Sequence, residues 1–174
     1  MRKTIFNRSA SVLAAALVVG GLAFAAPASA ETKSAVTASE LEAILTEAGL
    51  SPTMTEDAAT GAPAASGKLG EIVFWVRALD CTGAPLACEN LMFFANFGLG
   101  RSVTPKDYVV INSYNDSKVF GRAYVIEAQS EIGVDYVIEL GGGVSKDHIA
   151  QNISRWADVV SAFIDSFRAG HESS

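Results

Sequence analysis

The sequence has 174 residues, 49% of them hydrophobic, and a formal net charge of −6 at pH 7. This length suits one globular domain that buries most of its apolar surface in a single core. Because phosphate backbones and anionic lipids are bound by clustered Lys and Arg, so acidic a chain is not expected to have a nucleic-acid or anionic-lipid partner.

The first 30 residues have the pattern of a secretory signal peptide. Three basic residues among the first eight positions precede an apolar run over 9–24, and an alanine-rich exit ends at Ala30. The run is shorter than the roughly 20 residues that cross a bilayer, which favours cleavage after Ala30 over a retained anchor. We therefore expect a signal peptide over 1–30, a polar lead over 31–36, and a periplasmic or secreted protein.

Cleavage of this segment would leave a chain that is more acidic than the full sequence. The segment holds three basic residues and no acidic ones, so the remaining 144 residues carry 10 Lys and Arg against 19 Asp and Glu, a formal charge of −9. No later stretch is apolar enough to span a membrane. We expect no membrane span after signal removal.

A helix over 37–49 is the first element expected after the lead. Thr37 and Glu40 form a capping box at its start, and Gly49 provides its stop. Residues 51–70 are rich in Ala, Gly, Pro and Ser, which indicates short edge strands separated by loops.

Two strongly apolar segments, 71–80 and 89–97, read as central strands with both faces at least partly covered. The only two cysteines, Cys81 and Cys88, flank the turn between them. In an exported protein these residues are expected to pair across the base of a hairpin. A redox or metal pair is the alternative, but six intervening residues do not match C-x-x-C spacing and no histidine lies nearby.

The second half begins with a helix over 105–115, marked by a Thr-Pro start. A strand over 121–128 and an alternating, half-buried strand over 134–140 follow. The longest helix runs over 145–168 with one continuous apolar stripe, and residues 170–174 are expected to be a disordered tail. The element order predicts an α+β domain with a mostly antiparallel sheet of about five strands and three helices.

Three short motifs resemble the YbjN family of bacterial proteins. They lie at 111–115 (INSYN), 120–124 (FGRAY) and 142–145 (GGVS), the last leading into an aromatic helix. The resemblance covers 37–169 and implies a fold like that of type III secretion chaperones. It also implies a non-enzymatic sensory transduction regulator or chaperone-like module that binds another protein, with a homodimer as one form. The residues that carry the resemblance are Asn112, Tyr114, Asn115, Gly121, Arg122, Gly142, Gly143 and Trp156.

Four aromatic residues of the predicted strands are candidates for a partner surface, because these strands carry more apolar surface than one helix layer covers. They are Trp75, Phe93, Phe94 and Phe97. The alternative is a periplasmic carrier, in which the same residues line a pocket for a small apolar ligand.

Catalytic, cofactor and metal sites are not expected. His148 is the only histidine within 37–169, and it has no second histidine or free cysteine as a partner. The glycines at 141–143 precede a helix but lack the lysine of a P-loop, so a turn is favoured over an anion site. Asn112 and Asn115 share a helix face, and we expect them to bond to neighbouring backbone rather than to a ligand.

Overall fold

The computed structural model describes residues 32–172. The predicted signal peptide therefore lies outside the described residues. The fold is α+β, as predicted, with a six-stranded antiparallel sheet in the order β2-β3-β4-β5-β7-β6 and a small second sheet of β1 and β8. Its elements are β1 (Thr32–Lys33), α1 (Ala38–Glu47), β2 (Thr53–Glu56), β3 (Pro63–Leu69), β4 (Ile72–Thr82), β5 (Ala87–Gly98), α2 (Pro105–Ser117), β6 (Arg122–Ile126), the 3-10 turn η1 (Glu127–Gln129), β7 (Glu131–Glu139), β8 (Val144–Ser145) and α3 (Lys146–Glu172).

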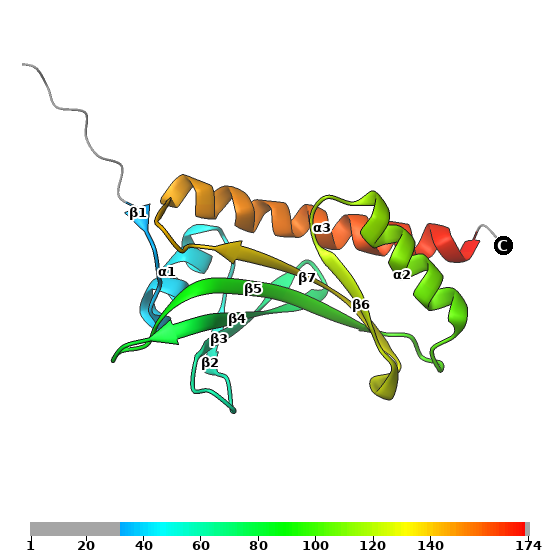
Figure 1. Ribbon diagram of the computed structural model, residues 1–174, viewed down its shortest axis with the longest axis horizontal. Helices are drawn as coiled ribbons and strands as arrows, with labels where there is room; N and C mark the ends of the chain where they lie inside the picture. Colours follow the sequence, from blue (N-terminus) through cyan, green and yellow to red (C-terminus); the bar gives the residue numbers. More distant parts are fainter. Residues whose placement is uncertain (1–31, 173–174) are drawn as a thin grey trace, which may run out of the picture.

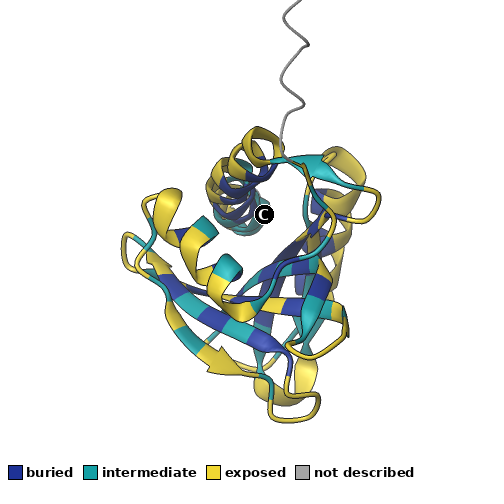
Figure 2. Cartoon of the chain, turned by 90° about the vertical axis from the view of Figure 1, so that its left-hand side faces the viewer, coloured by how far each residue is buried: buried dark blue, intermediate teal, exposed yellow. Residues whose placement is uncertain are grey.

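The helices gather on one side of the curved sheet, where α3 runs along its length and α2 lies beside the C-terminal half of α3 (Figure 1). We call this helix-covered side the inner face and the opposite side the outer face. Successive residues of a strand point to opposite faces. Burial alternates accordingly over the central parts of β4 and β5, whereas residues 132–136 of β7 are all buried, and Figure 2 shows the buried and exposed residues along the strands.

The core lies between the inner face and α3. Trp156 of α3 is fully buried, and its ring centroid lies 6.2 Å from that of Phe74 and 6.0 Å from that of Phe93. Farther along α3, Phe163 packs on Phe97 at 5.7 Å. The apolar stripe predicted for this helix is therefore the surface that packs on the sheet.

Helix α1 begins as the sequence predicts. The Thr37 amide donates to Glu40 Oε2 at 2.8 Å, and the Glu40 amide donates back to Thr37 Oγ1 at 3.4 Å. Lys33 of β1 reaches the same carboxylate at 2.7 Å. The hydrogen bond from Lys33, followed by that from the Thr37 amide, lowers the pKa of Glu40 to about 2. One carboxylate thus joins the first strand to the first helix.

A buried carboxylate fastens the start of α2. Asp107 is inaccessible to solvent and accepts two hydrogen bonds from the Arg101 guanidinium, each of 2.7 Å. The Thr104 amide and hydroxyl donate to it at 2.7 and 2.8 Å. The Arg101 hydrogen bonds hold the pKa of Asp107 well below its usual range, and those from Thr104 act in the same direction.

Helix α3 extends to Glu172, so residues 170–172 are helical and the prediction of a disordered tail is wrong for them. His171 Nε2 lies 3.0 Å from Asp107 Oδ1, which ties the last turn of α3 to the start of α2. Gly170 permits this approach, since a Cβ there would lie 2.7 Å from Val110 Cγ2. These long-range contacts order residues that have no local signal for helix.

The sheet has six strands rather than about five, because β2 and β3 pair with each other and β3 pairs with β4 over residues 64–69. The predicted disulfide is present: Cys81 and Cys88 face each other in the register of β4 and β5. No helix between residues 32 and 172 is both long and apolar enough to cross a membrane.

Candidate functional site

The outer face of the sheet carries an apolar strip that no helix covers (Figure 1). Val73 and Trp75 of β4 are each 39% exposed, and Val137 of β7 is 42% exposed. Met92 and Phe94 of β5 lie between them and are half-buried. We call these five residues the outer strip.

The aromatic pair of the outer strip is held in place by its neighbours. Trp75 and Phe94 are cross-strand partners whose rings stack with centroids 5.8 Å apart. The Arg77 guanidinium lies 5.4 Å from the centroid of the Phe94 ring, and Arg77 also pairs with Asp57 at 3.2 Å. These contacts restrict the side-chain rotamers, so binding there would lose little conformational entropy.

Polar contacts border the outer strip toward the β6 edge. Arg122 of β6 forms an ion pair with the buried carboxylate of Asp135 on β7. The Tyr124 hydroxyl donates to Asn96 Oδ1 at 2.8 Å. Burial, followed by the nearby charge of Asp135, raises the pKa of Tyr124 to about 12, so this hydroxyl keeps its proton at neutral pH. Gly133 makes room for the ring, because a Cβ there would lie 2.5 Å from it.

The four aromatic residues predicted to form a partner surface are divided between the two faces. Trp75 and Phe94 lie on the outer face, as that prediction requires. Phe93 is 0% exposed beneath α3, and Phe97 contacts Phe163 on the same inner face. The prediction is therefore wrong for Phe93 and Phe97, because the two-residue period of a strand turns these positions toward the helices.

Sequence reasoning missed three members of the outer strip. Val73 and Met92 lie on strands whose two faces are both apolar, so the pattern gave no reason to select one face. Val137 lies on the same face of its strand as Asp135 and Glu139. The alternation along that strand marked this face as outward and could have identified Val137.

The INSYN and FGRAY motifs fasten α2 to the edge strand β6. Asn115 Oδ1 accepts from the Ala123 amide at 2.8 Å, and Asn115 Nδ2 donates to the Ala123 carbonyl at 3.0 Å. The Tyr114 hydroxyl donates to a carbonyl of the connecting loop at 3.3 Å. Gly121 has φ +82° and lies so close to α3 that a Cβ would be 2.6 Å from Val159 Cγ1. The expectation that Asn115 bonds to neighbouring backbone is confirmed.

The other motif residues lie apart from one another. Gly142 and Gly143 adopt φ values of +80° and +90° in the turn before β8 and α3. Trp156 belongs to the core, and its Nε1 is buried with no hydrogen-bond partner among residues 32–172. Asn112 is exposed on α2, and Arg122 lies beside the outer strip. The motif positions therefore support the fold at several points and do not converge on one site.

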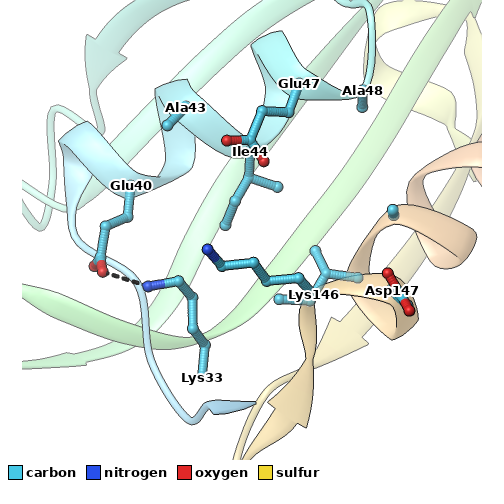
Figure 3. A pocket seen from close by; sticks show the side chains of 10 residues that line it. Lys33, Glu40, Ala43, Ile44, Glu47, Ala48, Lys146 and Asp147 are labelled. Carbon is cyan, nitrogen blue, oxygen red and sulfur yellow. Dashed lines mark hydrogen bonds and ion pairs between the residues drawn. The ribbon is translucent and has the colours of Figure 1, made fainter. Parts of the chain in front are cut away.

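A hollow of about 480 Å³ lies between α1 and the start of α3 (Figure 3). Lys33 and Glu40 form an ion pair at its wall, and the Lys146 side chain extends toward α1. The lining mixes both charges with apolar residues such as Ile44. None of the four predicted aromatic residues lines this hollow.

His148, the only histidine within 37–169, is exposed in the first turn of α3. Its amide donates to Ser145 Oγ at 3.1 Å, as expected if Ser145 caps the start of this helix. Within residues 32–172, His, Cys, Asp and Glu form no cluster of three that could hold a metal ion.

Comparison with known proteins identifies relatives of this fold. The chain resembles the crystal structure of YbjN from E. coli with a TM-score of 0.51 and 13% identity, covering 75% of this chain and 91% of that one. An uncharacterized protein from Methanothermobacter thermautotrophicus gives a TM-score of 0.48 and 14% identity, covering 79% and 99%. Among curated proteins, no match was found.

A family model gives the most direct assignment. The model of YbjN, described as "Putative bacterial sensory transduction regulator", matches residues 37–169. This match spans most of the chain and includes all three motifs. The protein belongs to the YbjN family.

Proposed function

We propose that this protein is exported and acts in the periplasm or outside the cell by binding another protein, in a regulatory or chaperone-like role. Its family is described as one of sensory transduction regulators rather than of enzymes. The proposal needs no catalytic group and no cofactor, and a second copy of the chain is one possible partner.

The outer strip is the observation that carries this proposal. It places an exposed tryptophan and an exposed valine on β4 and a second exposed valine on β7, with Met92 and Phe94 of β5 between them. Burial of apolar surface contributes roughly 25 cal/mol per Å² to association, and tryptophan is enriched among residues that dominate interface energies. Because Trp75 is already stacked on Phe94, the strip is ordered before a partner arrives.

Two features support export. Residues 1–30 have the three-part pattern of a signal peptide, and the chain holds its two cysteines as a disulfide, which persists in oxidising compartments. Mass spectrometry of the protein purified from the periplasm or medium tests this part. We expect a chain that begins at Glu31, and retention of full-length protein in the cytoplasm would refute export.

Capture experiments test partner binding through the outer strip. Wild-type protein and the variants Trp75→Ser and Val109→Ser are immobilised and exposed to the same extracellular or periplasmic extract. Val109 is a matched control, because it is 65% exposed but lies on α2 on the other side of the sheet. We expect Trp75→Ser to lose a partner that Val109→Ser retains.

Light scattering completes the test by detecting a second copy as the partner. If wild-type protein is a strict monomer and captures nothing, or if Trp75→Ser captures the same proteins as wild type, the proposal is wrong.

A further inference from the structure

The two edge strands of the six-stranded sheet differ in whether their outward backbone groups have hydrogen-bond partners. At one edge, the Asn115 side chain bonds to both the amide and the carbonyl of Ala123, so β6 is closed at Ala123 beneath α2. The opposite edge is β2. An unpaired edge strand can accept a further strand from another polypeptide.

The register shows which backbone groups of β2 face outward. In an antiparallel pair, alternate residues direct both amide and carbonyl toward the neighbouring strand, and the residues between them direct these groups away. The Asp57 amide donates to the Ala62 carbonyl at 2.8 Å, which shows that the odd-numbered residues direct their backbone groups toward β3. Thr53 and Thr55 therefore bond to β3, whereas the amides and carbonyls of Met54 and Glu56 point away from it.

No backbone hydrogen bond to these outward groups is formed within residues 32–172. Met54 and Glu56 thus offer two donors and two acceptors at the spacing of one strand ladder. An extended polypeptide is the ligand that matches this spacing, because its own amides and carbonyls alternate with the same period.

A groove of about 760 Å³ adjoins this edge, between β2, the start of α1 and the tip of the β4–β5 hairpin. Its apolar lining includes Met54, Pro85 and Leu86. Its charged lining residues are Glu42 and Glu56, and neither Lys nor Arg is found among the described residues that line it. The charge of the groove is therefore complementary to a basic segment.

We propose that β2 binds an extended, basic segment of a partner polypeptide, which adds to the sheet as a further strand. The inference rests on the proposed function and specifies the chemistry of the partner. Backbone pairing with Met54 and Glu56 supplies register, apolar side chains of the segment contact Met54 and Leu86, and its Lys or Arg residues face Glu42 and Glu56. A second copy of β2 would instead place like charges together.

Peptide titrations monitored by NMR test this proposal on the isotope-labelled protein that begins at Glu31. The probe is a short synthetic peptide of the repeat Lys-Lys-Val-Val with blocked ends, which as a strand places both Lys and Val on each face. Controls are the Glu and Val counterpart and a version with N-methyl groups on every amide, which cannot donate along either edge. We expect the Lys and Val peptide to shift the Met54 and Glu56 amide resonances, and neither control to do so.

Two variants of β2 and one control variant on α1 test the proposal further. Met54→Pro removes an outward amide while leaving the bonds of Thr53 and Thr55 to β3, and it is expected to weaken binding by about tenfold. Glu56→Lys is expected to reverse the charge preference, whereas Glu47→Lys, on the exposed side of α1 and outside this groove, is expected to retain it.

Each contrary outcome overturns strand addition. No shift at Met54 or Glu56, equal shifts with the N-methylated peptide, or concentration-dependent shifts without peptide would each do so. Shifts confined to residues around Trp75 would also overturn it while leaving the proposed function intact, since that function is judged by the separate capture experiment with Trp75→Ser.

Discussion

The two faces of the central strands differ although they are built from consecutive residues. Phe93 is fully buried against Trp156, whereas its neighbour Phe94 is only half-buried beside the exposed Trp75. On the inner face, the aromatic side chains pack under α3. On the outer face, some aromatic side chains remain accessible to solvent. This difference indicates that stability and partner binding depend on separate sets of residues, which substitutions can test.

The largest expected effect is at the centre of the inner face. Trp156→Ala should destabilise the protein by about 4 kcal/mol, because it removes a large buried side chain and leaves a cavity. Trp75→Ala on the outer face should cost less than about 1 kcal/mol, since Trp75 is already partly in solvent. Urea unfolding of both variants provides the measurement, and equal losses would refute the assignment of roles to the faces.

An ion pair on the covered side should matter more than one on the outer face. Asp107→Ala is expected to cost about 3 kcal/mol, because it removes the acceptor of two hydrogen bonds from Arg101 and two from Thr104. The matched control is Asp135→Ala on the outer face, which among the described residues leaves unpaired only the Arg122 guanidinium, 74% exposed, and should cost less than about 1 kcal/mol. Urea unfolding at neutral pH compares the two, and a larger loss for Asp135→Ala would contradict the comparison.

The Asp107 contacts also predict a pH dependence. Since the folded-state pKa of Asp107 is lowered, its contribution is fully present above the unfolded pKa of about 4 and is lost as the pH falls through the folded value. Wild-type protein should therefore lose stability below about pH 4 more steeply than Asp107→Asn. Parallel stability profiles for the two proteins would show that Asp107 is not held as described.

The disulfide should have an intermediate effect, because it links β4 and β5 irrespective of face. Replacing both Cys81 and Cys88 by Ala is expected to cost roughly 2 to 3 kcal/mol on the chain-entropy model for so short a loop. Urea unfolding with and without reductant measures this cost. Reductant should destabilise wild type and leave the double variant unchanged, and equal sensitivity of the two would contradict this prediction.

The smallest expected effect is at the closed edge of the sheet. Asn115→Ala removes two hydrogen bonds to Ala123 and should cost about 1 to 2 kcal/mol, with faster amide exchange at Ala123. The exposed Asn112 provides the control, and Asn112→Ala should change stability by less than about 0.5 kcal/mol. Unchanged exchange at Ala123 in Asn115→Ala would show that this side chain does not close the edge.

Features with local causes could be predicted from the sequence. The capping box of Thr37 and Glu40 depends on residues three positions apart, and the stripe of α3 repeats within one helix. The disulfide follows from two cysteines on either side of one turn. In each case the partners lie close together in the sequence.

Features that depend on distant contacts could not be predicted in the same way. Segments 71–80 and 89–97 are apolar at successive positions, so their pattern does not reveal which face α3 covers. The order of α3 at His171 depends on Asp107, 64 positions away in the chain. The contrast between β6 and β2 appears only when strand pairing places them at opposite edges.

Site-specific photo-crosslinking in living cells tests the central claim, that the outer face binds a protein partner. A photoreactive amino acid replaces Val137 of the outer strip in one protein and the exposed Asp158 of α3 in a control protein, and Trp75 is retained in both. We predict a crosslinked adduct with another polypeptide at position 137 and none at position 158. An absent adduct at position 137, or the same adducts at both positions, would contradict the account.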